Sequence, residues 1–262
     1  MVKKLLIDNP AVSNIVFYPR KTPIPKETDP NIKVLKFQID KNVLIGGFFY
    51  LNDLNLPTVL LFHGNGEVAA DYQYFINFFF KCGVNLAVVD FRGYGFSSGD
   101  PFYTSLIIDA LPIYNAFHKW IIENSFRDSI FILGRSLGSI CASEIGSYNP
   151  ESLCGVIFES GFASIYDMMT GLFRINGQEI TPEFLSKYSN DTRIRKFKKP
   201  VLVIHGTMDY IIPYQQGKLI YENIPETTEK KLVLIEGAGH NNIFSFEDEY
   251  ITSVEEFIKK FQ

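Results

Sequence analysis

From residue 32 onward, short β-rich runs alternate with longer helix-like segments, and this order constrains the fold more than any other feature of the chain. Such alternation builds a mostly parallel sheet covered by helices, an α/β architecture. Two early runs, Ile32–Asp40 and Val43–Tyr50, alternate in polarity like an antiparallel hairpin at a sheet edge. Six later runs are continuously apolar, as in strands buried on both faces: Thr58–Phe62, Leu86–Val89, Ile130–Leu133, Val156–Phe158, Val201–Ile204 and Leu232–Ile235. Helices are predicted at about 67–82, 104–123, 137–148, 214–223 and 246–261.

The segment 162–199 interrupts this alternation after the sixth β-rich run. It is longer than a normal connection and places glycine and proline among aromatic residues. We therefore predict a small cap, inserted after the sixth strand, that covers the functional site. A length of 262 residues fits one domain with a full hydrophobic core, so we expect a single domain, 1–262, that includes the cap.

A serine lies in the glycine-bracketed sequence Gly134-Arg135-Ser136-Leu137-Gly138, directly after the fifth β-rich run and before a helix-like segment. This context is that of a nucleophile elbow, a sharp strand-to-helix turn that holds the serine in a strained conformation. Glycines are needed beside it because a Cβ would collide with the neighbouring strand and helix. Ser136 is the candidate nucleophile.

A serine hydroxyl needs a histidine as general base, and the chain has four histidines. His63 and His205 each end a buried run before a glycine, where a neutral imidazole bonded to nearby backbone is expected. His118 is expected to lie on the surface of a helix. His240 lies in a glycine-containing loop between the last strand and the last helix, at the end of the sheet where such folds bind ligands. We favour His240.

The acid that orients this histidine should stand at the end of another strand. Asp209 follows the buried run that ends at Ile204. With Asp209 as the acid, the three residues occur along the chain in the order Ser, Asp, His, as in enzymes with a nucleophile elbow. Glu159 also ends a strand and is the competing candidate. We favour Asp209.

Acyl transfer also requires donors for the developing oxyanion, normally two backbone N–H groups. Leu137, directly after the candidate nucleophile, is expected to supply one of them. The second is expected from Asn65, in a glycine-bracketed turn after the third strand, although this turn could also be an ordinary helix cap.

Six ordered motifs resemble those of the α/β-hydrolase superfamily, nearest to serine-aminopeptidase-like hydrolases, monoacylglycerol lipases and acyl-protein thioesterases. They are His63-Gly64-Asn65-Gly66, the segment 90–99, Gly134-Arg135-Ser136-Leu137-Gly138, Glu159-Ser160-Gly161-Phe162, His205-Gly206-Thr207-Met208-Asp209 and Gly239-His240. The resemblance implies the α/β-hydrolase fold and cleavage of carboxylic ester or thioester bonds through an acyl-enzyme, without a metal or an organic cofactor. Ser139 departs from the pattern, because many relatives have a second glycine there.

Two alternatives to an ester or thioester hydrolase stay open. A serine aminopeptidase-like peptidase would need a carboxylate for the substrate's free ammonium, and Glu159 or Glu67 could provide it. A non-catalytic binding protein of the same fold is the other, but such proteins usually lack one of the three residues that are all present here.

The substrate class rests on the predicted cap. Phe162, Tyr166, Phe173 and Phe184 could line a pocket for an acyl chain, or they could simply dock the cap onto the core. The basic segment 193–199 could attract an anionic substrate or a lipid surface, although a solvated face is the commoner explanation.

Charge and composition limit the partners. The formal net charge of −4 gives no reason to expect nucleic acid, so the expected partner is a small-molecule acyl substrate. The three cysteines fit neither a metal site nor a disulfide framework and are interpreted as core residues in a reducing compartment. No apolar run is long enough to span a membrane or to serve as a signal peptide, and a cytoplasmic location is therefore expected.

Overall fold

The computed structural model describes residues 5–26 and 29–262 and contains an eight-stranded sheet in the order β1-β2-β4-β3-β5-β6-β7-β8. The strands are β1 (Ile32–Asp40), β2 (Val43–Tyr50), β3 (Thr58–Phe62), β4 (Asn85–Val89), β5 (Ile130–Arg135), β6 (Leu153–Glu159), β7 (Val201–Gly206) and β8 (Lys230–Ile235). β2 pairs antiparallel with both β1 and β4, and every neighbouring pair from β4 to β8 is parallel. The predicted mostly parallel sheet with an antiparallel edge is confirmed.

Burial along the strands follows their position in the sheet. The central strands β3, β4 and β5 are buried along their whole length, as expected for continuous apolar runs. Edge strand β1 instead alternates, with Leu35 and Phe37 buried and Lys36 exposed. Successive side chains of a strand point to opposite faces, so a strand with one face in solvent alternates buried and exposed residues, whereas a strand covered on both faces is buried throughout.

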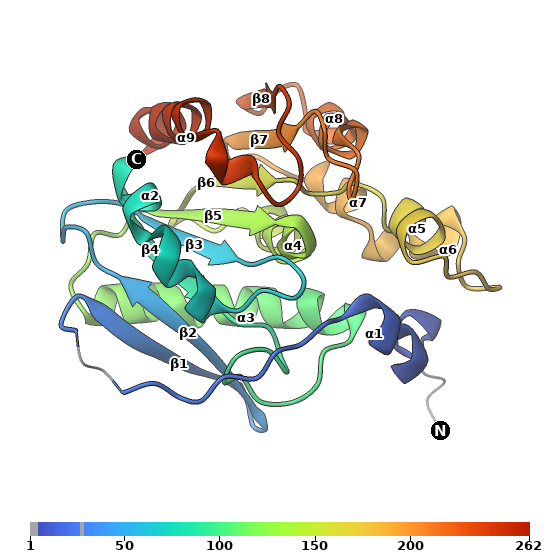
Figure 1. Cartoon of the computed structure of the whole chain (residues 1–262), viewed down its shortest axis with the longest axis horizontal. Helices are drawn as coiled ribbons and strands as arrows, with labels where there is room; N and C mark the ends of the chain where they lie inside the picture. Colours follow the sequence, from blue (N-terminus) through green and yellow to red (C-terminus); the bar gives the residue numbers. More distant parts are fainter. Residues whose placement is uncertain (1–4, 27–28) are drawn as a thin grey trace.

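Helices cover both faces of the sheet, and alternate side chains of β3 enter two separate cores. On one face α3 (Tyr103–Glu123) packs against α4 (Ser139–Tyr148), and α8 (Tyr214–Asn223) contributes to the same core. On the other face α2 (Ile76–Lys81) packs against α9 (Glu247–Phe261) (Figure 1). Within the described ranges no helix has the length and apolarity needed to cross a bilayer.

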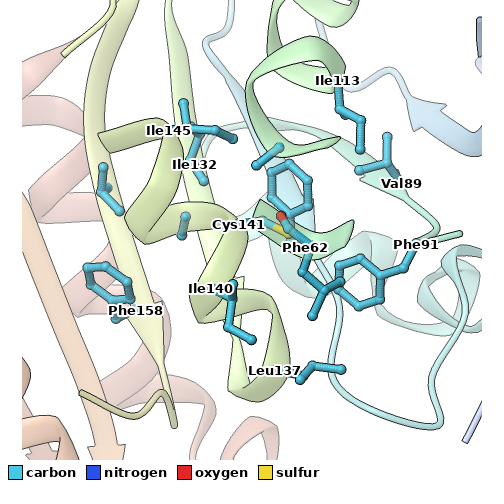
Figure 2. Close-up of a cluster of buried hydrophobic side chains, with 14 of the residues drawn as sticks. Phe62, Val89, Phe91, Ile113, Ile132, Leu137, Ile140, Cys141, Ile145 and Phe158 are labelled. Carbon is cyan, nitrogen blue, oxygen red and sulfur yellow. The ribbon is translucent and has the colours of Figure 1, made fainter. Parts of the chain in front are cut away.

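The core beneath α4 anchors the turn that precedes this helix. Phe62, Ile132 and Phe158 project from three neighbouring strands toward Ile140 and Ile145 of α4 (Figure 2). All five side chains are fully buried. Burial of such a side chain stabilises the fold by about 1.5–3 kcal/mol, so α4 is held firmly at the end of β5.

The cap expected after the sixth strand is present between β6 and β7. It consists of short helical pieces: α5 (Ile165–Asp167), the π-helical turn η4 (Met168–Leu172), α6 (Pro182–Leu185), the 3-10 turn η5 (Ser186–Tyr188) and α7 (Asn190–Ile194). In Figure 1 the parallel strands point toward the side of the molecule on which α5 and α6 lie. The cap therefore stands near the carboxyl ends of the strands, where α/β folds bind ligands.

Residues 5–26 form an N-terminal arm with a helix that was not predicted from the sequence. Its helix α1 (Pro10–Val16) is capped at the N-terminus by Asn9, whose side chain accepts a hydrogen bond from the amide of Ala11 at 2.9 Å. The side chain of Asp8 accepts a hydrogen bond from the amide of Thr104 at 2.9 Å, which fastens the arm to the start of α3. The amide of Leu6 donates to Glu179 of the cap at 2.9 Å. The arm thus joins the body of the protein to the cap.

Candidate active site

Ser136 stands directly after β5 and opens the turn η3 (Ser136–Gly138) that leads into α4. Its φ of +50° lies in the left-handed region that L-residues rarely adopt. A Cβ on Gly138 would lie 2.0 Å from the carbonyl oxygen of Phe62, and one on Gly134 would lie 2.6 Å from Cβ of Ala142. The strained serine and the two obligatory glycines have the geometry of a nucleophile elbow.

His240 lies between Ser136 and Asp209. Its Nε2 is 3.0 Å from Oγ of Ser136, and its Nδ1 is 2.7 Å from Oδ2 of Asp209. An ionised carboxylate only accepts hydrogen bonds, so Nδ1 carries the proton and Nε2 is free to accept the serine proton. The loops after β5, β7 and β8 therefore bring together the three residues singled out from the sequence, in the arrangement of a nucleophile, a base and an orienting acid.

The surroundings of Asp209 keep it ionised. Its side chain is fully buried, which alone would raise its pKa. Hydrogen bonds from His205 and His240, together with the amides of Ile211 and Ile212 at 2.9 and 2.8 Å, hold the pKa of Asp209 below its usual range. The carboxylate is thus fixed in position and charged at neutral pH, as stabilisation of an imidazolium requires.

Glu159, the competing acid, faces other partners. Its Oε1 pairs with Arg135, and its Oε2 accepts a hydrogen bond from the hydroxyl of Tyr250 at 2.6 Å. Its side chain is fully buried at the end of β6. The geometry therefore favours Asp209 over Glu159 as the partner of His240.

Leu137 and Asn65 both line the cavity beside Ser136. The side chain of Asn65 is held on the side of the N-terminal arm, because its Oδ1 accepts hydrogen bonds from the amide of Tyr18 at 3.0 Å and the hydroxyl of Tyr94 at 2.7 Å. Its Nδ2 donates to the carbonyl of Val16 at 2.6 Å. The anchored side chain fixes the backbone of this turn next to the serine.

A cavity of about 330 Å³ opens above Ser136 and His240. This volume lies at the small end of the range for ligand pockets. Apolar side chains from the cap, the N-terminal arm and the loop after β7 form most of its wall: Val16, Phe162, Ile165, Met168, Met169, Leu172, Phe173, Ile211 and Ile212. Such a lining suits a short or medium apolar group more than a charged one.

Two of the four predicted substrate-binding residues lie outside this cavity. Phe162 and Phe173 line it, whereas Tyr166 and Phe184 are not among the described residues that do so. Ile165, Met168, Met169 and Leu172 face the cavity at helical spacing, so Tyr166 points elsewhere and packs partly buried against the core. Phe184 packs against the ring of Tyr188 in the outer part of the cap.

The contribution of the N-terminal arm was missed from the sequence. Val16 and Tyr18 form part of the cavity wall. The available signals were Asn9 followed by Pro10, a helix start, and the apolar residues Val12 and Val16 spaced four apart. These signals are short, and they do not reveal that the arm returns to the end of the sheet.

Two weaker sequence features have structural explanations. Arg193 of the basic segment is buried and pairs with Glu144, and none of residues 193–199 is among the described residues that line the cavity. Ser139, which replaces a common glycine, is buried, and its hydroxyl accepts a hydrogen bond from Asn190 at 3.2 Å. The cap thus uses this serine as an anchor.

His63, His205, Cys82 and Cys141 have the environments expected from the sequence, whereas Cys154 is only partly buried. Nδ1 of His63 is 2.7 Å from the carbonyl of Gly64, and Nε2 of His205 is 2.8 Å from that of Ile212. Cys82 and Cys141 are buried free thiols, and burial raises the pKa of Cys82 to about 12. These thiols are therefore protonated packing groups.

Comparisons with known proteins agree with this fold. A family profile described as serine aminopeptidase, S33, matches residues 55–190. Protein bem46 of Schizosaccharomyces pombe is 27% identical over 227 residues, covering 84% of this chain and 74% of its own. Alpha/beta hydrolase domain-containing protein 17C of Xenopus tropicalis is 27% identical over 235 residues, covering 87% of this chain and 70% of its own. The solved structure of the Pyrococcus furiosus esterase Pf2001 superposes with a TM-score of 0.72 at 23% identity, covering 93% of this chain and 98% of that chain.

Proposed function

The chain belongs to the serine aminopeptidase S33 family of α/β hydrolases, and we propose that it cleaves carboxylic ester or thioester bonds through an acyl-enzyme on Ser136. One observation supports this most strongly. Oγ of Ser136, both ring nitrogens of His240 and a carboxylate oxygen of Asp209 form one line of hydrogen bonds, with lengths of 3.0 and 2.7 Å. We further propose that 1–262 act as a single catalytic domain with 162–199 as its cap.

In the proposed reaction, Oγ of Ser136 attacks the acyl carbonyl carbon while its proton passes to Nε2 of His240. Asp209 stabilises the imidazolium that forms. The backbone N–H groups of Asn65 and Leu137 donate to the oxyanion of the tetrahedral intermediate. When this intermediate collapses, the bond to the leaving alcohol or thiol breaks, and His240 returns the proton to it. Water, deprotonated by His240, then attacks the acyl-serine ester; the bond to Oγ of Ser136 breaks, His240 passes the proton to Oγ, and the carboxylic acid is released.

The shape and lining of the cavity support an apolar acyl group as substrate. Met168, Met169 and Phe173 form a flexible apolar wall from the cap, and Val16 closes it from the N-terminal arm. Each methylene of an acyl chain that enters such a pocket contributes up to about 0.8 kcal/mol to transition-state binding. The small volume limits this gain to short and medium chains.

The family also contains aminopeptidases by name, but the carboxylates here favour an ester or thioester substrate. Glu67 is the one acid among the described residues that line the cavity. Its oxygens already accept hydrogen bonds from Arg135 and from the amide of Gly64, both at 2.8 Å, and from Tyr72 at 2.8 Å. Three of the about four acceptor positions of this carboxylate are thus occupied, and its charge is already paired with Arg135, which weakens its attraction for a substrate ammonium.

The test is turnover of a substrate panel by the wild type and by Ser136→Ala. The panel holds p-nitrophenyl esters from acetyl to decanoyl, the matching thioesters and aminoacyl p-nitroanilides. We expect hydrolysis of esters or thioesters that Ser136→Ala lowers by about 10⁶-fold in kcat, because the nucleophile is lost. The control Ser147→Ala removes a serine hydroxyl from α4 away from the site and should leave kcat unchanged. Faster cleavage of the anilides would indicate a peptidase, and no turnover of any substrate would indicate a binding protein.

A further inference from the structure

We propose that Arg135 is a positioning residue that ties the oxyanion loop, Gly64–Glu67, to the loop that holds His240. This inference rests on the proposed function of Ser136 and goes beyond it, because Arg135 touches neither substrate nor nucleophile through its side chain. Its side chain is 5% exposed, and the residue ends β5 opposite Glu159, which ends the neighbouring strand β6.

The first contact of Arg135 leads to the histidine. Its Nη2 donates to the backbone carbonyl of His240 at 3.0 Å, and its guanidinium lies over the ring of Phe244 with 5.5 Å to the ring centre. His240 and Phe244 both belong to the stretch between β8 and α9. The guanidinium therefore holds the backbone that sets the position of the catalytic imidazole.

The second contact leads to the oxyanion loop. Nε of Arg135 donates to Oε1 of Glu67 at 2.8 Å, and Oε2 of Glu67 accepts from the amide of Gly64 at 2.8 Å. Gly64 directly precedes Asn65, one of the two proposed oxyanion donors. Through Glu67, the same guanidinium fixes the turn that carries the amide of Asn65.

A third set of contacts makes the tie rigid. Nη1 of Arg135 pairs with Glu159, whose other oxygen accepts from Tyr250 of α9 at 2.6 Å, and Glu67 also accepts from Tyr72 at 2.8 Å. A planar guanidinium presents its donors at fixed angles, so three directed contacts leave the group little freedom. A lysine has one rotatable ammonium and can satisfy only part of this set.

Glu67 and Tyr250 keep their hydrogen-bonding roles at neutral pH. Burial disfavours the ionised form of Glu67, but the adjacent Arg135 outweighs burial and lowers the pKa of Glu67 to about 2. Burial and the neighbouring Glu159 raise the pKa of Tyr250 well above its usual value, so its hydroxyl remains a donor. One guanidinium thus joins two carboxylates, and its loss would leave the fully buried Glu159 and the partly buried Glu67 without this cationic partner.

The test compares kcat and KM for p-nitrophenyl butyrate in Arg135→Met and Arg135→Lys, with the folded fraction measured by circular dichroism. We expect Arg135→Met to lower kcat per folded molecule by about 10²-fold, the effect of a displacement of about 1 Å in a catalytic group, with KM changed less than kcat. Arg135→Lys should recover part of the loss. An unchanged kcat in folded Arg135→Met would overturn the proposal.

Two further variants separate positioning from simple destabilisation. Arg92→Met is the matched control, because Arg92 also pairs with a buried carboxylate, Asp109, and lies 5.5 Å over a phenylalanine ring, that of Phe102. Neither of these partners lines the cavity, whereas Glu67 and His240, which Arg135 contacts, both do. Arg92→Met should lower the melting temperature and leave kcat per folded molecule unchanged. If Arg135→Met does not fold, Arg135→Met/Glu67→Gln/Glu159→Gln removes all three charges together, and kcat at the wild-type level in this variant would overturn the proposal.

Failure of this inference is distinguishable from failure of the proposed function. Wild-type protein that neither turns over esters nor reacts with a fluorophosphonate at Ser136 would refute the function. Wild-type protein that does both, with Arg135 variants equal to it in kcat, would refute only the role of Arg135.

Discussion

Replacing Asp209 with asparagine separates the orientation of His240 from the packing around it. Asparagine has nearly the same shape, and its amide oxygen can still accept hydrogen bonds from the amides of Ile211 and Ile212, which lie 2.9 and 2.8 Å from Oδ1. Its amide nitrogen then takes the place of Oδ2, 2.7 Å from Nδ1 of His240. Because that nitrogen donates, the imidazole must accept at Nδ1 and carry its proton on Nε2.

A proton on Nε2 faces Oγ of Ser136 and prevents His240 from acting as a general base. We therefore expect Asp209→Asn to lower kcat about 10⁴-fold, which corresponds to about 5.4 kcal/mol of transition-state stabilisation. The fold should remain intact, since the backbone hydrogen bonds to this side chain persist. The assay is steady-state hydrolysis of p-nitrophenyl butyrate at pH 7.5, with urea unfolding to measure stability.

Glu159→Gln is the comparison variant for the acid, because Glu159 also ends a strand beside the site. It contacts Arg135 and Tyr250 rather than His240, and we expect a loss in kcat no larger than about 10²-fold. A larger loss in Glu159→Gln than in Asp209→Asn would refute the assignment of the acid.

Gly138→Ala should unfold or inactivate the protein, because its Cβ would lie 2.0 Å from the carbonyl oxygen of Phe62; overpacking costs about 1–3 kcal/mol or more, which urea unfolding measures. Phe173→Ala should move the optimum of kcat/KM to a longer acyl chain, and each added methylene should raise kcat/KM by up to about fourfold. Phe184→Ala, outside the cavity, should leave the optimum in place. Because the pKa of Glu67 falls from 4.5 to about 2 on folding, its stabilisation, at most about 3 kcal/mol, is complete above about pH 4.5 and is lost as pH falls toward 2. Urea unfolding of Glu67→Gln and the wild type should thus differ most above about pH 5 and converge near pH 2.

Continuous apolar runs explain how much of the fold could be predicted from the sequence. Strands such as β3 and β5 are buried on both faces, and their composition alone reveals this. Ser136 and Asp209 follow such strands, whereas His240 follows β8, an edge strand that is only partly buried although its apolar run was expected to be covered on both faces. Parallel strands bring their carboxyl ends to one edge, so the proximity of the three residues follows from the order of elements.

Features that depend on tertiary contacts could not be predicted in the same way. The N-terminal arm reaches the site through single hydrogen bonds, such as that from the amide of Tyr18 to Asn65, which no local pattern encodes. The composition of the cap indicated aromatic residues near the site. It did not reveal which face of the cap helices is turned to the cavity, and the structure places Met168 in the cavity wall but not Tyr166. The sequence placed Arg135 beside the site without any geometry, and its proposed role follows from partners distant in sequence.

The central claim is that Ser136 is an activated nucleophile, and covalent trapping tests it most directly. The intact protein is treated with a fluorophosphonate, digested, and mapped by mass spectrometry. We expect one phosphonyl adduct, on the peptide that contains Ser136, formed at a rate that falls sharply in Asp209→Asn. Ester hydrolysis without an adduct at Ser136, or an adduct on another residue that abolishes turnover, would contradict the claim.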